Sequence, residues 1–121
     1  MSTFSVHFRD AETPAGPARV LGLNGELDAH TAPEFEAAIQ SCLDDGQARL
    51  IADGSELDYV SSAGLGVFMA FLETTRDAGG DLKIAALPDR VFEVFDLLGF
   101  PTLFDFAATV EDAAAQFPAA P

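Results

Sequence analysis

The sequence contains few basic residues, few histidines and a single cysteine. Six basic residues stand against twenty acidic ones, which gives a formal net charge of −14 for 121 residues. Nucleic acids and anionic membrane surfaces attract the opposite sign of charge, so the composition argues against direct binding to either. This charge suits a partner protein that has a basic face.

Long apolar runs are also absent. No apolar run approaches the roughly 18 residues that a membrane-spanning helix needs, and the first residues lack the basic and apolar regions of a signal peptide. Cys42 is the only cysteine, so no internal disulfide can form, which suits a reducing cytosol. Its place on a predicted helix favours packing over reactivity. We therefore expect a cytoplasmic protein without a membrane span.

The two histidines leave little room for catalysis or metal binding. His7 lies on a predicted strand, and no His/Cys cluster has the spacing of a metal site. His30 lies near Asp28, and a triad with Ser62 can be imagined. However, the Gly-x-Ser-x-Gly motif is absent, and Asp28 and His30 are close together in the sequence. No glycine-rich phosphate loop is present either, so we expect no catalytic residue, no metal, no cofactor and no enzyme activity.

Apolar material for a core is plentiful. Hydrophobic residues make up 49% of the chain, and eleven of them are phenylalanines. A chain of this length has room for one domain, which we expect to span residues 1–121. The proline-rich end at 118–121 is expected to be a flexible tail.

Apolar patterns of two periods alternate along the chain, and they predict alternating strands and helices. The predicted strands are 4–8, 19–23, 49–53, 82–86 and a short one at 103–106, and the segment 10–17 is predicted to be a turn. The predicted helices follow Thr31, begin near Ser62, open at Pro88 and follow Thr109. Strands separated by helices indicate an α/β fold with a mostly parallel sheet, in which the first strand is antiparallel to the second.

Several residues mark the ends of these helices. Thr31 followed by Glu34 is a capping-box pattern, and Gly99 is expected to end the third helix in the left-handed conformation. Ser61 and Ser62 stand where N-caps stand.

The most informative segment is Asp53-Gly-Ser-Glu-Leu-Asp-Tyr-Val-Ser-Ser-Ala-Gly-Leu-Gly66. It is typical of a strand end, a short loop and the first turn of a helix whose apolar stripe consists of Leu65, Phe68, Met69 and Leu72. Ser61 and Ser62 would then lie beside unpaired backbone N–H groups at the positive end of the helix dipole, where a phosphate is accommodated. The local pattern alone favours serines that only cap the helix.

This segment resembles the signature of STAS domains, and specifically that of small anti-sigma-factor antagonists. The segment Gly25-Glu-Leu-Asp-Ala-His-Thr-Ala-Pro33 is similar to the family's Gly-Glu-Leu-Asp block between its second strand and first helix. Weaker matches at 82–88 and 91–106 resemble the late strand, the third helix and the final strand. The resemblance implies a STAS-type sandwich, a mixed and mostly parallel sheet of about five strands with four helices mainly on one face.

The same resemblance implies a function. In this family a partner kinase, which is also the anti-sigma factor, phosphorylates one serine of the Ser-x-Gly-Leu motif, and the matching residue is Ser62. The unphosphorylated protein would bind the kinase and release a sigma factor, and a phosphatase would restore it. Ser61 stands where well-matched members carry Asp, so it is an alternative acceptor.

The resemblance also suggests which residues contact the partner. These are Asp28, His30, Thr31, Ser61, Ser62, Gly64 and Leu65. Because Ser61 replaces the family's Asp, Asp28 is a candidate to supply the acidic group near Ser62. Gly64 either permits a close approach of the partner or packs inside the fold. Separately, Asp53 and Ser55 are expected to order the loop before the helix, with Asp53 accepting hydrogen bonds from backbone N–H groups.

Two other classes of protein share parts of this pattern. A response-regulator receiver would place its phosphoacceptor where Asp53 lies, with Asp10 and Glu12 as its acidic pair. That pattern is incomplete, because no lysine follows Phe106 and the only lysine, Lys83, lies within a predicted strand. Other STAS domains are accessory subunits of transporters or stress-signalling assemblies and bind partners without being phosphorylated. An intact Ser62 favours a protein that is switched by phosphorylation over such an accessory subunit, which we call a scaffold.

Overall fold

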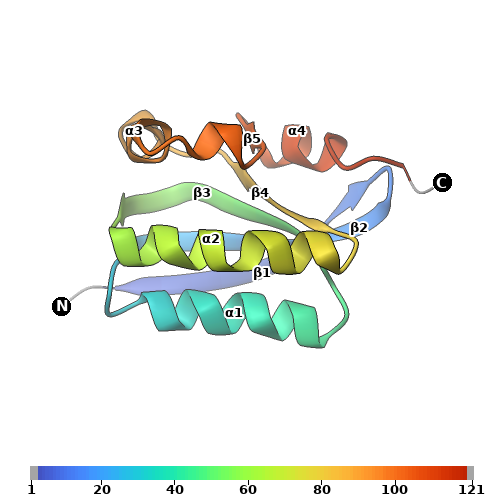
Figure 1. Cartoon of the computed structure of the whole chain (residues 1–121), viewed down its shortest axis with the longest axis horizontal. Helices are drawn as coiled ribbons and strands as arrows, with labels where there is room; N and C mark the ends of the chain where they lie inside the picture. Colours follow the sequence, from blue (N-terminus) through green and yellow to red (C-terminus); the bar gives the residue numbers. More distant parts are fainter. Residues whose placement is uncertain (1–2, 120–121) are drawn as a thin grey trace.

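The computed structural model describes residues 3–119, which form one five-stranded sheet with helices packed on it (Figure 1). Its elements are β1 (Phe4–Thr13), β2 (Gly16–Leu27), α1 (Ala32–Asp44), β3 (Arg49–Val60), α2 (Ser62–Asp77), β4 (Asp81–Ala85), α3 (Asp89–Leu97), the 3-10 helix η1 (Phe100–Thr102), β5 (Phe106–Ala107) and α4 (Val110–Ala115). The strand order is β1-β2-β3-β4-β5, antiparallel between β1 and β2 and parallel elsewhere. The predicted mixed, mostly parallel α/β sheet is confirmed.

The two faces of the sheet carry separate apolar cores. Neighbours such as Leu50 and Ile51 belong to different cores, because successive side chains of a strand point to opposite faces. The larger core unites α1, α2 and α3 around Phe68, whose ring centroid lies 4.9 Å from that of Phe35 and 5.4 Å from that of Phe95. Such aromatic pairs contribute about 0.5–1.5 kcal/mol each beyond the area they bury. In Figure 1, α1 and α2 run side by side, and α4 packs on the opposite face.

The second half of β3 corrects the sequence interpretation, which placed a loop after Asp53. The strand continues to Val60 because β3 stays paired with β2 through two irregularities, each with one extra residue in β3. One extra residue follows Asp53 and the other follows Leu57. The buried residues Leu57 and Val60 are therefore three positions apart, and the period of two that reveals a strand is lost.

The prediction that the whole segment 10–17 is a turn is also wrong. The pairing between β1 and β2 continues to Thr13 and Gly16. The turn holds only Pro14 and Ala15. The Thr13 hydroxyl accepts a hydrogen bond from Ala15 N at 3.0 Å, and Gly16 has a φ of +109° that glycine adopts readily. Proline and glycine here shorten the turn of a long hairpin instead of ending its strands.

The later helix ends agree better with the sequence. Gly99 is left-handed with a φ of 77°, as predicted, and Thr109 caps α4 by accepting from Asp112 N at 3.0 Å. The last strand, predicted at 103–106, is confined to Phe106–Ala107, because residues 103 and 104 form a turn and a bend and only Phe106 and Ala107 are register partners of β4 residues. Of the predicted tail 118–121, the first two residues have no regular secondary structure, and residues 120 and 121 lie outside the described part. None of the helices in residues 3–119 is long and apolar enough to cross a membrane.

Candidate functional site

The two segments singled out by the sequence meet at one edge of the sheet. β2 ends at Leu27 and β3 at Val60, and these two residues are register partners in parallel strands. Ser61 N donates a hydrogen bond to Leu27 O at 2.9 Å, which ties the start of α2 to the end of β2. The turn that follows Leu27 and the serine pair that follows Val60 therefore lie side by side.

Ser62 is the first residue of α2 and its side chain is exposed. The first hydrogen bond of the helix runs from Leu65 N to Ser61 O at 3.0 Å, so the N–H groups before Leu65 have no partner within the helix. The prediction that a serine hydroxyl caps α2 is wrong, because the Ser61 side chain makes no cap hydrogen bond. An exposed hydroxyl thus lies beside open N–H groups at the positive end of a 16-residue helix.

Ser61 has a different environment. Its backbone is extended, with φ −102° and ψ 174°, and its Oγ is buried without a hydrogen-bond partner among residues 3–119. A buried unpaired hydroxyl costs about 1–3 kcal/mol. Of the two serine hydroxyls, that of Ser62 is therefore at the surface in this conformation and that of Ser61 is not.

The Asp28–Thr31 turn is ordered by its own side chains. Asp28 Oδ1 accepts from His30 N at 2.9 Å and from Thr31 N at 3.1 Å. Thr31 Oγ1 donates to Glu26 O at 2.8 Å and accepts from Asp28 N at 2.9 Å. The predicted capping box with Glu34 is therefore wrong, because the Thr31 hydroxyl faces back along the chain and makes no cap bond.

No hydrolase triad is assembled at this edge. Among the hydrogen bonds between described residues, none joins the His30 ring to Asp28 or to Ser62, and Asp28 meets only backbone N–H groups and the Thr31 hydroxyl. The described residues also contain no group of three or more His, Cys, Asp and Glu side chains that could hold a metal ion. The exposed His30 instead adds a polar ring to the surface of the turn before α1.

Gly64 and Leu65 lie inside the fold. Leu65 is 5% exposed, and a Cβ built on Gly64 would lie 2.6 Å from Leu27 Cγ and 3.1 Å from Val60 Cγ2. Direct contact of these two residues with a partner, as the sequence suggested, does not fit their burial. Glycine is needed at position 64 because the first turn of α2 sits directly on the ends of β2 and β3.

The exposed face of α2 contains residues that sequence reasoning missed. Ser62, Gly66 and Met69 are spaced i, i+4 and i+7, so they share one side of the helix, and all three are exposed. Met69, predicted to be buried, is 44% exposed, and Tyr59 at the end of β3 is 52% exposed. The same spacing of four and seven residues from Ser62 could have identified this face in the sequence.

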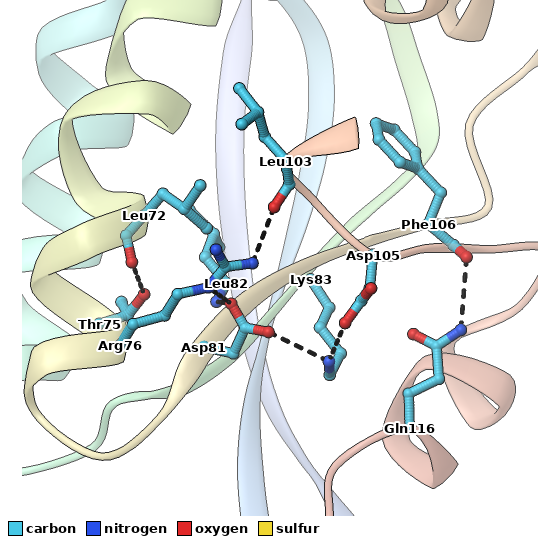
Figure 2. A network of polar contacts seen from close by, with 10 residues as sticks. All are labelled: Leu72, Thr75, Arg76, Asp81, Leu82, Lys83, Leu103, Asp105, Phe106 and Gln116. Atoms are coloured by element: carbon cyan, nitrogen blue, oxygen red, sulfur yellow. Dashed lines mark hydrogen bonds and ion pairs between the residues drawn. The ribbon is translucent and has the colours of Figure 1, made fainter. Parts of the chain in front are cut away.

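Asp53, which was expected to order a loop, lies within β3. Its Oδ1 accepts from Ser55 N at 3.0 Å, which orders an irregularity within β3 and not a loop. Arg9 lies 3.5 Å from the other carboxylate oxygen. Lys83 does not serve Asp53 as a receiver lysine would, because its ammonium pairs with Asp81 in β4 itself and with Asp105, which lies just before β5 (Figure 2).

Comparison with known proteins places these features in context. A family model described as STAS domain matches residues 9–113. BtrV of Bordetella bronchiseptica, which bears the provisional name anti-sigma factor antagonist, is 37% identical over 95 residues, covering 78% of this chain and 82% of that protein. A crystal structure of an anti-sigma factor antagonist from Mycobacterium paratuberculosis is similar with a TM-score of 0.80 and 25% identity, covering 92% and 91% of the two chains. The Bacillus cell fate determinant SpoIIAA, solved in its phosphorylated form, shares the fold with a TM-score of 0.65 and 23% identity, covering 92% and 96%.

Proposed function

The chain belongs to the STAS domain family, and from this premise we propose that it is an anti-sigma-factor antagonist controlled by phosphorylation of Ser62. Unphosphorylated, it binds an anti-sigma-factor serine kinase in the cytoplasm and thereby releases a sigma factor. When Ser62 is phosphorylated the protein dissociates from the kinase, and a phosphatase removes the phosphate and restores binding. The protein is the substrate of the switch and supplies no catalytic group.

The observation that carries this proposal is the exposure of the Ser62 hydroxyl at the start of α2. A phosphate there adds a charge of about −1.5 to −2 at neutral pH. The open N–H groups and the helix dipole favour that charge, so the fold is retained. The effect falls on the partner, which must accommodate a hydrated dianion in the contact. A penalty of about 3 kcal/mol corresponds to roughly a hundredfold in affinity.

The remaining surface supports a protein partner with a basic face. The chain has a net charge of −14, and such a charge steers oppositely charged partners into an encounter. Two further exposed side chains are Met69, on the same side of α2 as Ser62, and Tyr59, near the end of β3, and interfaces use both types often. Asp28, His30 and Thr31 add the polar rim of the proposed contact.

The scaffold interpretation predicts the same partner surface without phosphorylation. We would supply the purified protein with ATP and each anti-sigma-type serine kinase of its source organism, and map the modified residue by mass spectrometry. The matched variants are Ser62→Ala and Ser61→Ala. Phosphate on Ser62 that disappears only in Ser62→Ala supports the switch. Phosphate on Ser61, or a kinase that binds tightly and modifies neither serine, would contradict it.

A further inference from the structure

A cavity of about 420 Å³ lies at the end of α2 remote from Ser62. A helix of 16 residues is about 24 Å long, so this cavity is well separated from the proposed kinase contact. Three of the six basic residues of the chain line it, namely Arg49, Arg76 and Lys83. One carboxylate, that of Asp81, belongs to its lining. Half of the basic residues of a chain with a net charge of −14 thus line one cavity.

Lys83 forms the closed inner side of the cavity. It is 2% exposed, and its Nζ lies 2.7 Å from Asp105 Oδ2 and 3.2 Å from Asp81 Oδ2 (Figure 2). The ammonium also lies 4.7 Å from the centre of the Phe117 ring. Its three N–H donors are thus directed at two carboxylates and an aromatic face, so Lys83 links β4 to the segment before β5 and to the Phe117 ring after α4, and has no donor to spare.

The two arginines have unused donors. Each guanidinium carries five N–H groups. Arg76 uses Nε on Asp81 Oδ1 at 3.0 Å and one further nitrogen on Leu103 O at 2.8 Å (Figure 2). Arg49 uses Nε on Pro17 O at 3.1 Å, and among residues 3–119 it has no carboxylate within 4.0 Å. Both side chains therefore retain N–H groups that can donate to an oxyanion.

We propose that this cavity binds a small organic phosphate, whose phosphate group lies between Arg49 and Arg76. A guanidinium matches the geometry of a phosphate in two parallel hydrogen bonds, and two guanidiniums balance a dianion better than a monoanion. Phe117 and Pro118 supply an apolar wall for the organic part of the ligand. Gly79 leaves the rim open, since a Cβ built there would meet nothing within 4 Å. The size of the cavity fits a small molecule and not a protein segment.

The test is an NMR titration of the ¹⁵N-labelled protein with phenyl phosphate, inorganic phosphate and benzoate, each at matched ionic strength. We expect the backbone amides of Gly79 and Gly80 to shift and saturate, with phenyl phosphate binding tighter than the other two probes. Arg49→Gln should lower the affinity for phenyl phosphate at least about tenfold, because charge-assisted hydrogen bonds to the phosphate group are lost. The matched control is Arg90→Gln, which removes the same charge from α3, outside the cavity, and should bind like the wild type.

Several outcomes would overturn the proposal. If sodium chloride produces the same amide shifts, or if Arg49→Gln and Arg90→Gln lose the same affinity for phenyl phosphate, the protein responds only to ionic strength and net charge and has no phosphate site. Benzoate binding tighter than phenyl phosphate would exclude a phosphate site. If Arg49→Gln changes the whole spectrum, Arg49→Lys decides, because it keeps the charge and stem and loses the fork: wild-type affinity in that variant contradicts the assigned role of the guanidinium. None of these readouts involves the kinase, so they stand apart from the proposed function.

Discussion

Replacing Gly64 by alanine separates a packing role from a contact role at the start of α2. The new Cβ would lie 2.6 Å from Leu27 Cγ, 2.9 Å from Leu27 Cδ2 and 3.1 Å from Val60 Cγ2. Leu27 is fully buried and cannot move aside freely, and overpacking of this kind costs about 1–3 kcal/mol. Alanine recovers about 1 kcal/mol through its better helix propensity. We therefore expect a net loss of up to about 2 kcal/mol, which lowers Tm by up to about 8 °C.

The assay is thermal unfolding followed by circular dichroism, with Gly66→Ala as the matched control. Gly66 lies in the same helix, and a Cβ built there meets nothing within 4 Å. The same chemical change should therefore raise stability by up to about 1 kcal/mol at position 66. A Gly64→Ala protein that melts at or above the wild-type temperature, in step with Gly66→Ala, would refute the packing argument.

Three further predictions concern buried polar groups. Ser61→Ala should leave stability unchanged or raise it by up to about 1 kcal/mol in chemical denaturation, because it removes a buried hydroxyl that has no partner; a loss above that size would mean that the hydroxyl is bonded. Asp81→Asn should destabilise the fold by about 1–3 kcal/mol, because the Asp81 side chain is 15% exposed and pairs with two cations. Asp105→Asn should cost less than about 1 kcal/mol, because the Asp105 side chain is 57% exposed. Equal losses of stability for the two variants in urea unfolding would contradict this ranking. Burial raises the pKa of the Cys42 thiol, so iodoacetamide at mildly alkaline pH should label it only after unfolding, and rapid labelling of the native protein would show that it is accessible.

The parts of the fold that local chemistry determines could be predicted from the sequence. Gly99 and Thr109 mark helix ends through their own backbone and hydroxyl preferences, and both were predicted. The exposure of Ser62 at the start of α2 follows from an apolar stripe that begins only at Leu65.

What the sequence missed depends on partners far away in the chain. The extension of β3 to Val60 rests on pairing with β2, which tolerates two extra residues that erase the alternating pattern. The packing role of Gly64 depends on Leu27, 37 positions earlier, and the network around Lys83 joins it to Asp105, 22 positions later. A pattern of residue types does not contain such distances, so these roles became visible only in three dimensions.

The most direct test of the proposed switch is the affinity of the identified kinase for four forms of the protein, measured by calorimetry. The forms are the wild type, Ser62→Ala, Ser62→Asp and the protein phosphorylated on Ser62. We predict that Ser62→Ala binds like the wild type, since it removes only an exposed hydroxyl, and that Ser62→Asp binds more weakly, since it places a negative charge in the contact. The phosphorylated protein should bind roughly a hundredfold more weakly, as a penalty of about 3 kcal/mol requires. Equal affinity of the phosphorylated and unphosphorylated proteins would contradict control by phosphorylation and would favour the scaffold, which binds its partner without it.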